Sequence, residues 1–576
     1  METSLPGWVA TFARKYYTRT ISQFILHGNT TDFVPVKSTS SLKYSKLRDY
    51  LMNDLFRRRD LVVSYDRASG ILFRERETRE DFIRSLSAYD TLHGTTFTRQ
   101  LPRDPARAFM ILDNYFRIRI HDKKRIAFII EYADTIVPMG TTAHLSPEDR
   151  SILVFLQKWA KDTEFLNADM TIVLVAENLS EINHQIVRNP YTCEIEIPYP
   201  DEKERLEYIT YCIQEFPNIP TLLEMGPSIL AKHTAGVNLV HLKTLLYEIS
   251  ENKQLFTFKQ LTEKKKVIIE SEAAGLLEFI ETKFTLDNVA GHAHAKSHLR
   301  MAAQALKNGR GDALPMGYLV NGPVGTGKTF MVTCFAGEIG IPMLLLKNFR
   351  SQWVGVTETN LEKVFKILEA MTPVAVMIDE ADAYLGNRSS SGDSGVSSRV
   401  FSMIASFMSN TEHRGKIIWF LLTARPDLMP VDLKRQGRAE EHIALFYPQT
   451  IEERKDFFFV MLHKTGLLQL RDSQFNDEFF QNLKINSGAD MEAALIRAKF
   501  KAAANGKEQV LPEDIQFAFE DFIPPSYPEE IELMNLAAVV ECTSKELLPP
   551  KYRELSREEV LEKMQLLKKI ISQREH

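Results

Sequence analysis

The second half of the chain alternates short apolar runs with longer amphipathic segments. Residues 374–378 and 417–422 are continuously apolar and have the length of buried strands, and residues 317–321 have the pattern of a short buried strand. Strands that are buried on both faces show such runs, because helices cover both sides of a parallel sheet. Residues 330–340 follow the first run and have the spacing of a helix. The alternation predicts an α/β fold with a parallel sheet and crossover helices.

The first half repeats this order of elements. Residues 23–29 and 61–65 have the composition of strands, and residues 41–59 between them have helical spacing. Two further apolar runs, 125–130 and 170–176, end in polar residues, as the corresponding runs of the second half do. The recurrence predicts a second domain of the same type. An unrelated α/β domain with a coincidental strand order is the alternative.

These patterns divide the chain into five expected segments. They are an α/β domain over 1–200, a helical lid and bridge over 201–281, a second α/β core over 282–448, a helical lid over 449–522, and a helical tail over 523–576. The bridge contains apolar residues at i, i+3 and i+4 spacing in 238–246, as a lid helix would.

Composition is ordinary for a globular protein. Of 576 residues, 44% are hydrophobic and 26% are charged. No apolar run approaches the ~20 residues that a membrane span needs, and no secretory signal is visible. The four cysteines show no C-x-x-C spacing, so we expect reduced thiols and a cytoplasmic location. The net charge of −5 argues against nucleic acid as a partner.

One stretch of the second half carries a phosphate-binding pattern. Residues 322–329 fit G-x-x-x-x-G-K-[ST] at every fixed position, between an expected strand and an expected helix. Lys328 would reach the β- and γ-phosphates of a nucleoside triphosphate, and the Thr329 hydroxyl would hold Mg²⁺. The residues expected to bind the nucleotide here are Gly322, Pro323, Val324, Gly325, Thr326, Gly327, Lys328, Thr329 and Phe330.

Two acidic residues end the apolar run 374–378. A carboxylate at this place can hold the hydration shell of Mg²⁺, and its neighbour can polarise the attacking water. We assign Asp379 to the metal and Glu380 to general base catalysis. Because acidic pairs often end strands by chance, this assignment depends on the phosphate loop upstream.

Together these motifs resemble the AAA-type (AAA+) ATPases over about residues 284–500. Residues 284–291 look like the family's entry segment, so the backbone of Ala290 and Gly291 would flank the adenine. Residues 487–490 resemble the start of the lid helix that senses nucleotide. The resemblance implies a P-loop NTPase fold with a small helical lid, with ATP and Mg²⁺ as cofactors.

Two further segments resemble parts of the family that contact other chains. Residues 352–355 are similar to the family's first pore loop, in which Trp353 and Val354 would contact a translocating polypeptide. The segment with Arg435 and Arg438 looks like the arginine-finger segment, and guanidinium groups suit developing phosphoryl charge. Arginines at the edge of the domain would reach a neighbour's site, which implies a homo-oligomeric ring of six. Two solvated surface arginines are the alternative.

One position departs from the family. Ala424 stands where the family usually carries an Asn that positions the attacking water, and the Thr423 hydroxyl can substitute for it. We expect a ring that couples ATP hydrolysis to remodelling or unfolding of an unidentified protein, which Trp353 favours. The alternative, favoured by Ala424, is a slow nucleotide-dependent assembly switch or scaffold that threads nothing.

The first half lacks this chemistry. In place of the phosphate loop stands the sequence Gly28-Asn29-Thr30-Thr31-Asp32, without a lysine and with an aspartate that would repel phosphate. Glu131 stands where a metal-binding aspartate is expected, and no acid follows it. We therefore interpret residues 1–200 as a degenerate ATPase-like α/β domain in tandem with the intact one. This arrangement is similar to AAA proteins of bacteria and chloroplast genomes.

Overall fold

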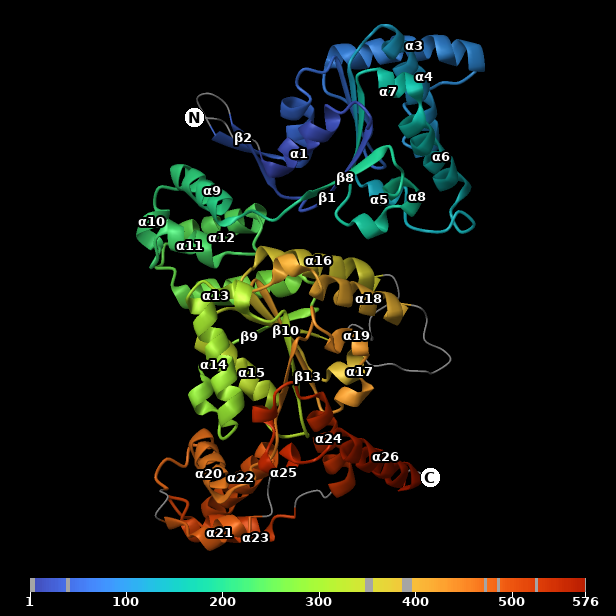
Figure 1. The fold of residues 1–576 in the computed structure, drawn as a ribbon. Helices are drawn as coiled ribbons and strands as arrows, with labels where there is room; N and C mark the ends of the chain where they lie inside the picture. Colours follow the sequence, from blue (N-terminus) through green and yellow to red (C-terminus); the bar gives the residue numbers. More distant parts are fainter. Residues whose placement is uncertain are drawn as a thin grey trace. The chain divides into compact units, whose positions relative to one another are not determined.

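The computed structural model describes residues 6–37, 42–347, 356–385, 396–470, 474–483, 487–523 and 527–574. Two units are distinguished, one of residues 1–273 with 358–370 and one of residues 274–357 with 371–576. Figure 1 shows their elements along the chain.

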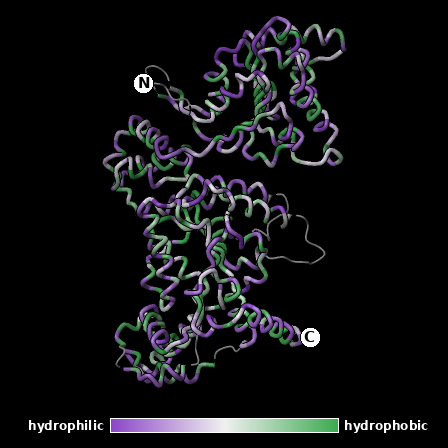
Figure 2. The backbone as a smooth tube through the Cα atoms, in the orientation of Figure 1, coloured by the Kyte–Doolittle hydropathy of each residue, from purple (hydrophilic) through white to green (hydrophobic). Residues whose placement is uncertain are grey.

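The first unit is built on a six-stranded sheet with the order β5-β4-β6-β7-β1-β8. β5 runs antiparallel to β4, and the other neighbouring strands run parallel. The central strands are buried along almost their whole length, which explains their continuous apolar runs and their green colour in Figure 2. The bounds are β1 (Gln23–Gly28), β4 (Leu61–Asp66), β5 (Gly70–Phe73), β6 (Ile126–Ile130), β7 (Met170–Val175) and β8 (Thr192–Ile197).

Helices cover both faces of this sheet. On one face Phe82, Phe109 and Trp159, from three different helices, form a core with alternate residues of the strands. On the other face Trp8 and Phe12 pack against the remaining strand residues. The helices are α1 (Gly7–Tyr16), α3 (Arg76–His93), α4 (Pro105–His121), α5 (Ala133–Ile136), α6 (Pro147–Lys161), α7 (Thr163–Asn167) and α8 (His184–Val187).

The expected helix over 41–59 is wrong in its first part. β2 (Phe33–Lys37) and β3 (Leu42–Lys46) form an antiparallel hairpin, and α2 (Leu47–Tyr50) begins only after it. Phe33 and Tyr44 of the hairpin contact the Tyr208 ring of a helix far along the chain. This long-range packing decides the local structure, and helical spacing alone does not reveal it.

A helical region follows the first sheet. It consists of α9 (Glu202–Glu215), α10 (Ile219–Leu222), α11 (Pro227–His233), α12 (Leu239–Asn252) and α13 (Phe258–Glu272). Asp201 and Glu204 form a capping box at the start of α9. The helices of the expected bridge, 201–281, end with α13, and β9 (Leu277–Ile280) is the edge strand of the second sheet.

The second sheet has the order β14-β10-β13-β12-β11-β9. The expected strands at 317–321 and 374–378 are confirmed as β10 and β12, and the expected helix after the phosphate loop is α15. The strands are β10 (Gly317–Asn321), β11 (Met343–Leu346), β12 (Val374–Ile378), β13 (Ile417–Thr423) and β14 (Glu441–Ala444). The helices of this unit are α14 (Ala293–Lys307), α15 (Lys328–Ile339), α17 (Ala381–Leu385), α18 (Val396–Met408) and α19 (Val431–Lys434). α16 (Val356–Ala370) belongs, from residue 358 on, to the first unit.

Two helical regions complete the second unit. α20 (Ile451–Lys464), α21 (Asp477–Gln481), α22 (Gly488–Ala504) and α23 (Pro512–Asp521) enclose an apolar core centred on Phe458. The tail consists of α24 (Pro528–Glu541), α25 (Pro550–Arg553) and α26 (Arg557–Arg574). Its apolar residues pack with Ala444 and Phe446 at the end of the sheet. No helix in the described parts of the chain is both long and apolar enough to cross a membrane.

The two sheets share one strand order. Read from the last parallel strand, the first sheet runs β8-β1-β7-β6-β4 and the second runs β14-β10-β13-β12-β11, each followed by an antiparallel edge strand. In both sheets the first strand therefore lies between the fourth and the fifth. The recurrence that the sequence predicts is confirmed at the level of topology, and the loss of ATPase chemistry from the first unit stays a prediction.

Candidate functional site

The predicted phosphate loop connects the end of β10 to the start of α15. Gly322 has φ +137°, and a Cβ atom there would lie 2.1 Å from the carbonyl oxygen of Leu445, after β14. Gly327 precedes the first residue of α15 and has φ +86°. L-residues rarely adopt the positive φ of Gly322 and Gly327. At Gly322 there is also no space for a Cβ atom. The loop therefore turns back over the helix N-terminus, where N–H groups attract anions.

Lys328 is held inside this loop. Its ammonium donates hydrogen bonds to the carbonyl oxygens of Gly322 at 2.8 Å and Pro323 at 2.9 Å. Burial lowers the pKa of Lys328 to about 8, and the charges of Asp379 and Asp382 oppose this shift. A half-buried cation surrounded by backbone dipoles is suited to a ligand with several negative charges.

The predicted metal residues lie together. Thr329 Oγ1 donates a hydrogen bond of 2.8 Å to Asp379 Oδ2, and Asp379 Oδ1 accepts from the backbone N–H of Glu380 at 2.9 Å. A hydroxyl and a carboxylate beside a phosphate loop are the oxygen ligands that Mg²⁺ prefers, so the residues fit the predicted ion. Glu380 is exposed and has φ +50°, an uncommon conformation for a residue other than glycine.

Thr423 lies at the end of β13, the strand between β10 and β12. Its hydroxyl donates to Asp382 Oδ1 at 2.6 Å and accepts from the Arg425 N–H at 2.9 Å. Sequence reasoning missed Asp382, although its spacing from Asp379 was a usable signal, because α17 begins directly after Glu380. The structure thus adds a third carboxylate to the site.

Three segments outside the loop reach it. The Gly488 N–H, at the start of α22, donates to the Gly325 carbonyl at 3.1 Å, so the helix that begins in the segment 487–490 contacts the loop. Tyr447 donates its hydroxyl proton to the Val324 carbonyl at 2.5 Å. His292, which directly follows Ala290 and Gly291, lies 3.2 Å through Nε2 from the Thr326 carbonyl. Burial lowers the pKa of His292 to about 4, so the neutral ring donates this bond.

The two arginines differ in exposure. The Arg435 side chain is 59% exposed and lies 3.6 Å from a carboxylate oxygen of Asp432. The Arg438 side chain is 11% exposed and donates to the Asp432 carbonyl at 2.7 Å. Arg435 is therefore the one available to a second chain. Trp353 and Val354, the predicted pore residues, lie outside the described residues.

The first unit has a different structure at the place of the phosphate loop. Gly28 again ends the first strand, with φ +99°, and a Cβ atom there would lie 2.6 Å from the Ile197 carbonyl oxygen. The chain then enters the β2–β3 hairpin rather than a helix. Asp32 is buried and accepts hydrogen bonds from Asn29 Nδ2 and from three backbone N–H groups, those of Phe33, Leu239 and Val240.

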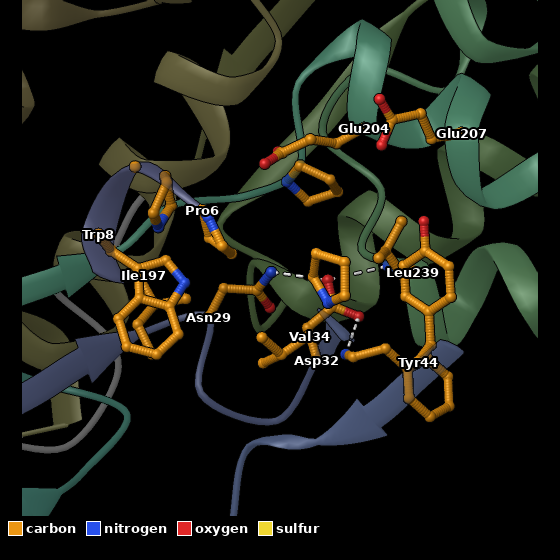
Figure 3. Close-up of a pocket in the computed structure, with 15 residues that line it drawn as sticks. Pro6, Trp8, Asn29, Asp32, Val34, Tyr44, Ile197, Glu204, Glu207 and Leu239 are labelled. Carbon is orange, nitrogen blue, oxygen red and sulfur yellow. Dashed lines mark hydrogen bonds between the residues drawn. The ribbon is translucent and has the colours of Figure 1, made fainter. Parts of the chain in front are cut away.

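Figure 3 shows Asp32 in a pocket with Asn29 and Leu239. Because Leu239 begins α12, the carboxylate occupies a helix N-terminus of the kind that attracts phosphate. Trp8, Tyr44, Glu204 and Glu207 also line this pocket, and its lining includes no lysine or arginine. Charge alone therefore disfavours a nucleotide in this pocket.

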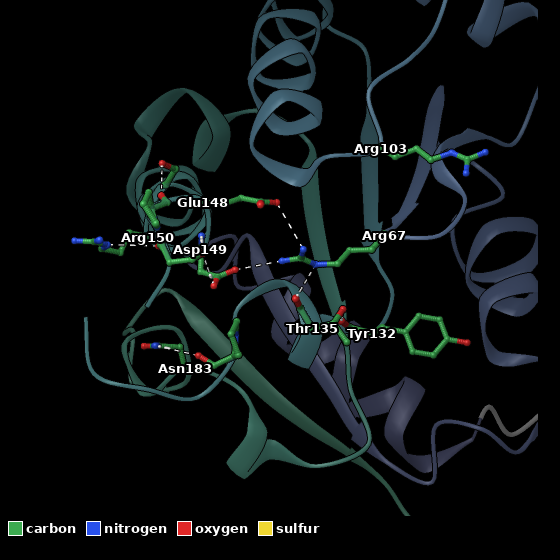
Figure 4. Close-up of polar contacts among 12 residues, drawn as sticks. Arg67, Arg103, Tyr132, Thr135, Glu148, Asp149, Arg150 and Asn183 are labelled. Carbon is green, nitrogen blue, oxygen red and sulfur yellow. Dashed lines mark hydrogen bonds and ion pairs between the residues drawn. The ribbon is translucent and has the colours of Figure 1, made fainter. Parts of the chain in front are cut away.

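The residues after β6 in the first unit also differ from those after β12 in the second. Glu131 and Tyr132 follow β6 as Asp379 and Glu380 follow β12, and Tyr132 has φ +51° against +50° for Glu380. A tyrosine thus stands at the position of the expected general base. Nearby, Arg67 pairs with Asp149 at 3.2 Å and with Glu148 at 3.6 Å, and donates to the Thr135 carbonyl (Figure 4).

Comparisons with known families match three parts of the chain. Residues 2–198 match the family described as AAA+ chaperone, N-terminal Rossmann-like domain. Residues 203–274 match AAA+ chaperone, second helical domain. Residues 318–447, which contain the site, match the ATPase family associated with various cellular activities (AAA).

Among individual proteins, the chain is similar to the uncharacterized AAA domain-containing protein ycf46 of Trieres chinensis, with 28% identity over 54% of this chain and 64% of the relative. It is 27% identical to the ATP-dependent zinc metalloprotease FtsH 2 of Salinibacter ruber, over 55% of this chain and 45% of the relative. It is 27% identical to the cell division cycle protein 48 homolog of Archaeoglobus fulgidus, over 56% of this chain and 47% of the relative. The matches thus cover about half to two thirds of these relatives.

The lowered pKa of Lys328 predicts a pH-dependent affinity for ATP. Only the charged ammonium attracts phosphate, so affinity should be full below pH 8 and fall as pH rises through the pKa of about 8. We expect ATP binding about tenfold weaker at pH 9 than at pH 7, since roughly a tenth of Lys328 stays charged there. Titration calorimetry from pH 7 to 9.5 measures this. The Lys328→Arg variant keeps its charge and should show no such bend; a flat profile in the unaltered protein contradicts the prediction.

Proposed function

We propose that this chain, a member of the AAA+ family, hydrolyses ATP in its second unit alone, in a ring that remodels or unfolds a protein partner. The observation that carries the proposal is the group of Lys328, Thr329, Asp379 and Glu380 around one loop. The first unit has Asp32 and Tyr132 at the corresponding places. We therefore assign it a scaffolding or docking role.

The chain's own residues account for the chemistry. The N–H groups of the loop and the Lys328 ammonium bind the phosphates and neutralise charge that develops on the γ-phosphoryl group. Glu380 accepts a proton from the water that attacks in line, and its exposed position leaves it accessible to that water. Thr329 and Asp379 would hold Mg²⁺, which supplies further neutralisation of phosphate charge.

The arginines support a shared site. An exposed guanidinium with one long contact to its own chain is free to reach a neighbour's phosphates, whereas Arg438 is buried against its own backbone. Burial and the nearby Arg435 charge lower the pKa of Arg438, and the charge of Asp432 opposes this shift. We propose that Arg435 enters the next chain's site and that Arg438 supports it, in a homo-oligomer of six.

The proposal that the ring remodels a protein partner is supported by Trp353 and by the similarity to the relatives named above. A large aromatic on a loop can hold an extended polypeptide through apolar contact. The second candidate function is a slow nucleotide-dependent assembly switch. Ala424 favours it, because alanine offers no hydrogen bond to the attacking water.

Glu380→Gln separates binding from chemistry. The amide keeps the shape of the side chain and loses the base, so we expect turnover to fall by about 100-fold or more while ATP affinity changes little. Phosphate release and titration calorimetry measure the two quantities. Unchanged turnover in this variant would exclude Glu380 as the base, and absent turnover in the unaltered protein at every concentration would oppose the proposed hydrolysis.

Mixing two inactive variants tests the ring. Lys328→Ala should fail to bind ATP but keep Arg435, and Arg435→Ala should bind ATP but lack the finger. If Arg435 acts between chains, mixtures of the two variants regain turnover. At some interfaces the intact ATP site of an Arg435→Ala chain then meets the intact Arg435 of a Lys328→Ala chain. Lys328→Ala mixed with the Lys328→Ala/Arg435→Ala double variant is the control and should stay inactive. Mixtures without recovered turnover would place Arg435 in its own chain's site or outside any site.

Trp353→Ala distinguishes the remodeller from the switch. We expect the variant to keep basal ATPase activity and to lose stimulation by casein, an unfolded model substrate. Val354→Ala, a smaller change in the same segment, is the comparison variant. A protein whose turnover does not respond to casein before substitution would support the switch.

A further inference from the structure

Asn321 is a fully buried amide without a hydrogen-bond partner. Its side chain is 0% exposed, and neither Oδ1 nor Nδ2 contacts a donor or acceptor within the described ranges of the chain. Leaving such a group unpaired costs about 1–3 kcal/mol, so native proteins almost always pair it with protein or water. An apolar residue would avoid this cost at the end of a buried strand. Asn321 therefore requires an explanation beyond packing.

The position of Asn321 links it to the site. It is the last residue of β10, and Gly322, the next residue, accepts a hydrogen bond from Lys328. In the sheet Asn321 pairs with Thr423, so the two side chains lie on the same face, about 5 Å apart at Cα. The preceding residues Tyr318 and Val320 face the core under α14 and α15, which places Asn321 on the opposite face.

Thr423 connects this face to the catalytic carboxylates. Its hydroxyl donates to Asp382, and the charge of Asp382 acts on Lys328. A buried water needs two to four polar partners. The amide oxygen and nitrogen of Asn321, the hydroxyl of Thr423 and the carboxylate of Asp382, which Thr423 contacts from α17, provide that number.

We propose that Asn321 is a positioning residue for ATP hydrolysis, which holds a buried water against the Thr423–Asp382 pair. The water fixes the Asp382 carboxylate beside Lys328 and the attacking water. This role rests on the proposed function, since it concerns the hydrolytic step. Asn321 directly precedes the phosphate-loop pattern of residues 322–329 and is not part of it.

The test compares Asn321→Leu, which keeps the branching at Cγ and removes both polar atoms, with Asn321→Ser, which keeps a hydroxyl that can hold the water. We expect kcat to fall about tenfold or more in Asn321→Leu, with KM for ATP within about twofold, and Asn321→Ser to recover most of the loss. A Tm of Asn321→Leu close to that of the unaltered protein shows that a loss of kcat does not come from unfolding. Phosphate release and thermal unfolding are the measurements.

Tyr318→Phe is the matched control. It removes a buried hydroxyl that also lacks a partner among the described residues, from the other end of the same strand. We expect its kcat to stay unchanged. A kcat of Asn321→Leu within about twofold of the unaltered protein, or equal losses in the Leu and Ser variants, would overturn the inference. Absence of turnover in the unaltered protein would instead overturn the proposed function itself.

Discussion

Both units depend on a close approach between the end of the first strand and the end of the last. The carbonyl oxygens of Leu445 and Ile197 lie where a side chain at Gly322 or Gly28 would begin. Only glycine leaves this space, and its positive φ turns the chain across the sheet edge. The loop that starts at this turn holds the Lys328 ammonium and accepts the hydrogen bond from Gly488.

The same scaffold carries opposite charges in the two units. In the second unit a buried ammonium and helix N–H groups form a site for phosphate. In the first unit Asp32 lies at a helix N-terminus, and four N–H donors oppose the rise of its pKa that burial causes. The Asp32 side chain thus supplies to the first unit the negative charge that the phosphates of a nucleotide would supply to the second.

The sequence predicted the second site in detail because its chemistry is local. Strand, loop and helix are contiguous from Gly317 to Ile339, and the apolar run before Asp379 is long enough to identify a buried strand. Three features escaped prediction because they depend on distant partners. The β2–β3 hairpin is fixed by contacts with Tyr208. Asp382 joins the site through its hydrogen bond with Thr423. The place of Asn321 beside Thr423 follows from the sheet register, which the sequence does not show.

The Asp32 carboxylate accepts hydrogen bonds from the backbone N–H groups of Leu239 and Val240. These bonds hold the N-terminus of α12 against the loop after β1, and the group that makes them belongs to the chain itself. A tethered ligand has no dissociation constant in the usual sense, because its effective concentration is set by covalent connection and not by the cell. The stabilisation that a free nucleotide gives depends on its concentration, whereas this contact is formed whenever the unit is folded. The contact of Asp32 with the N-terminus of α12 therefore does not depend on the ratio of ATP to ADP.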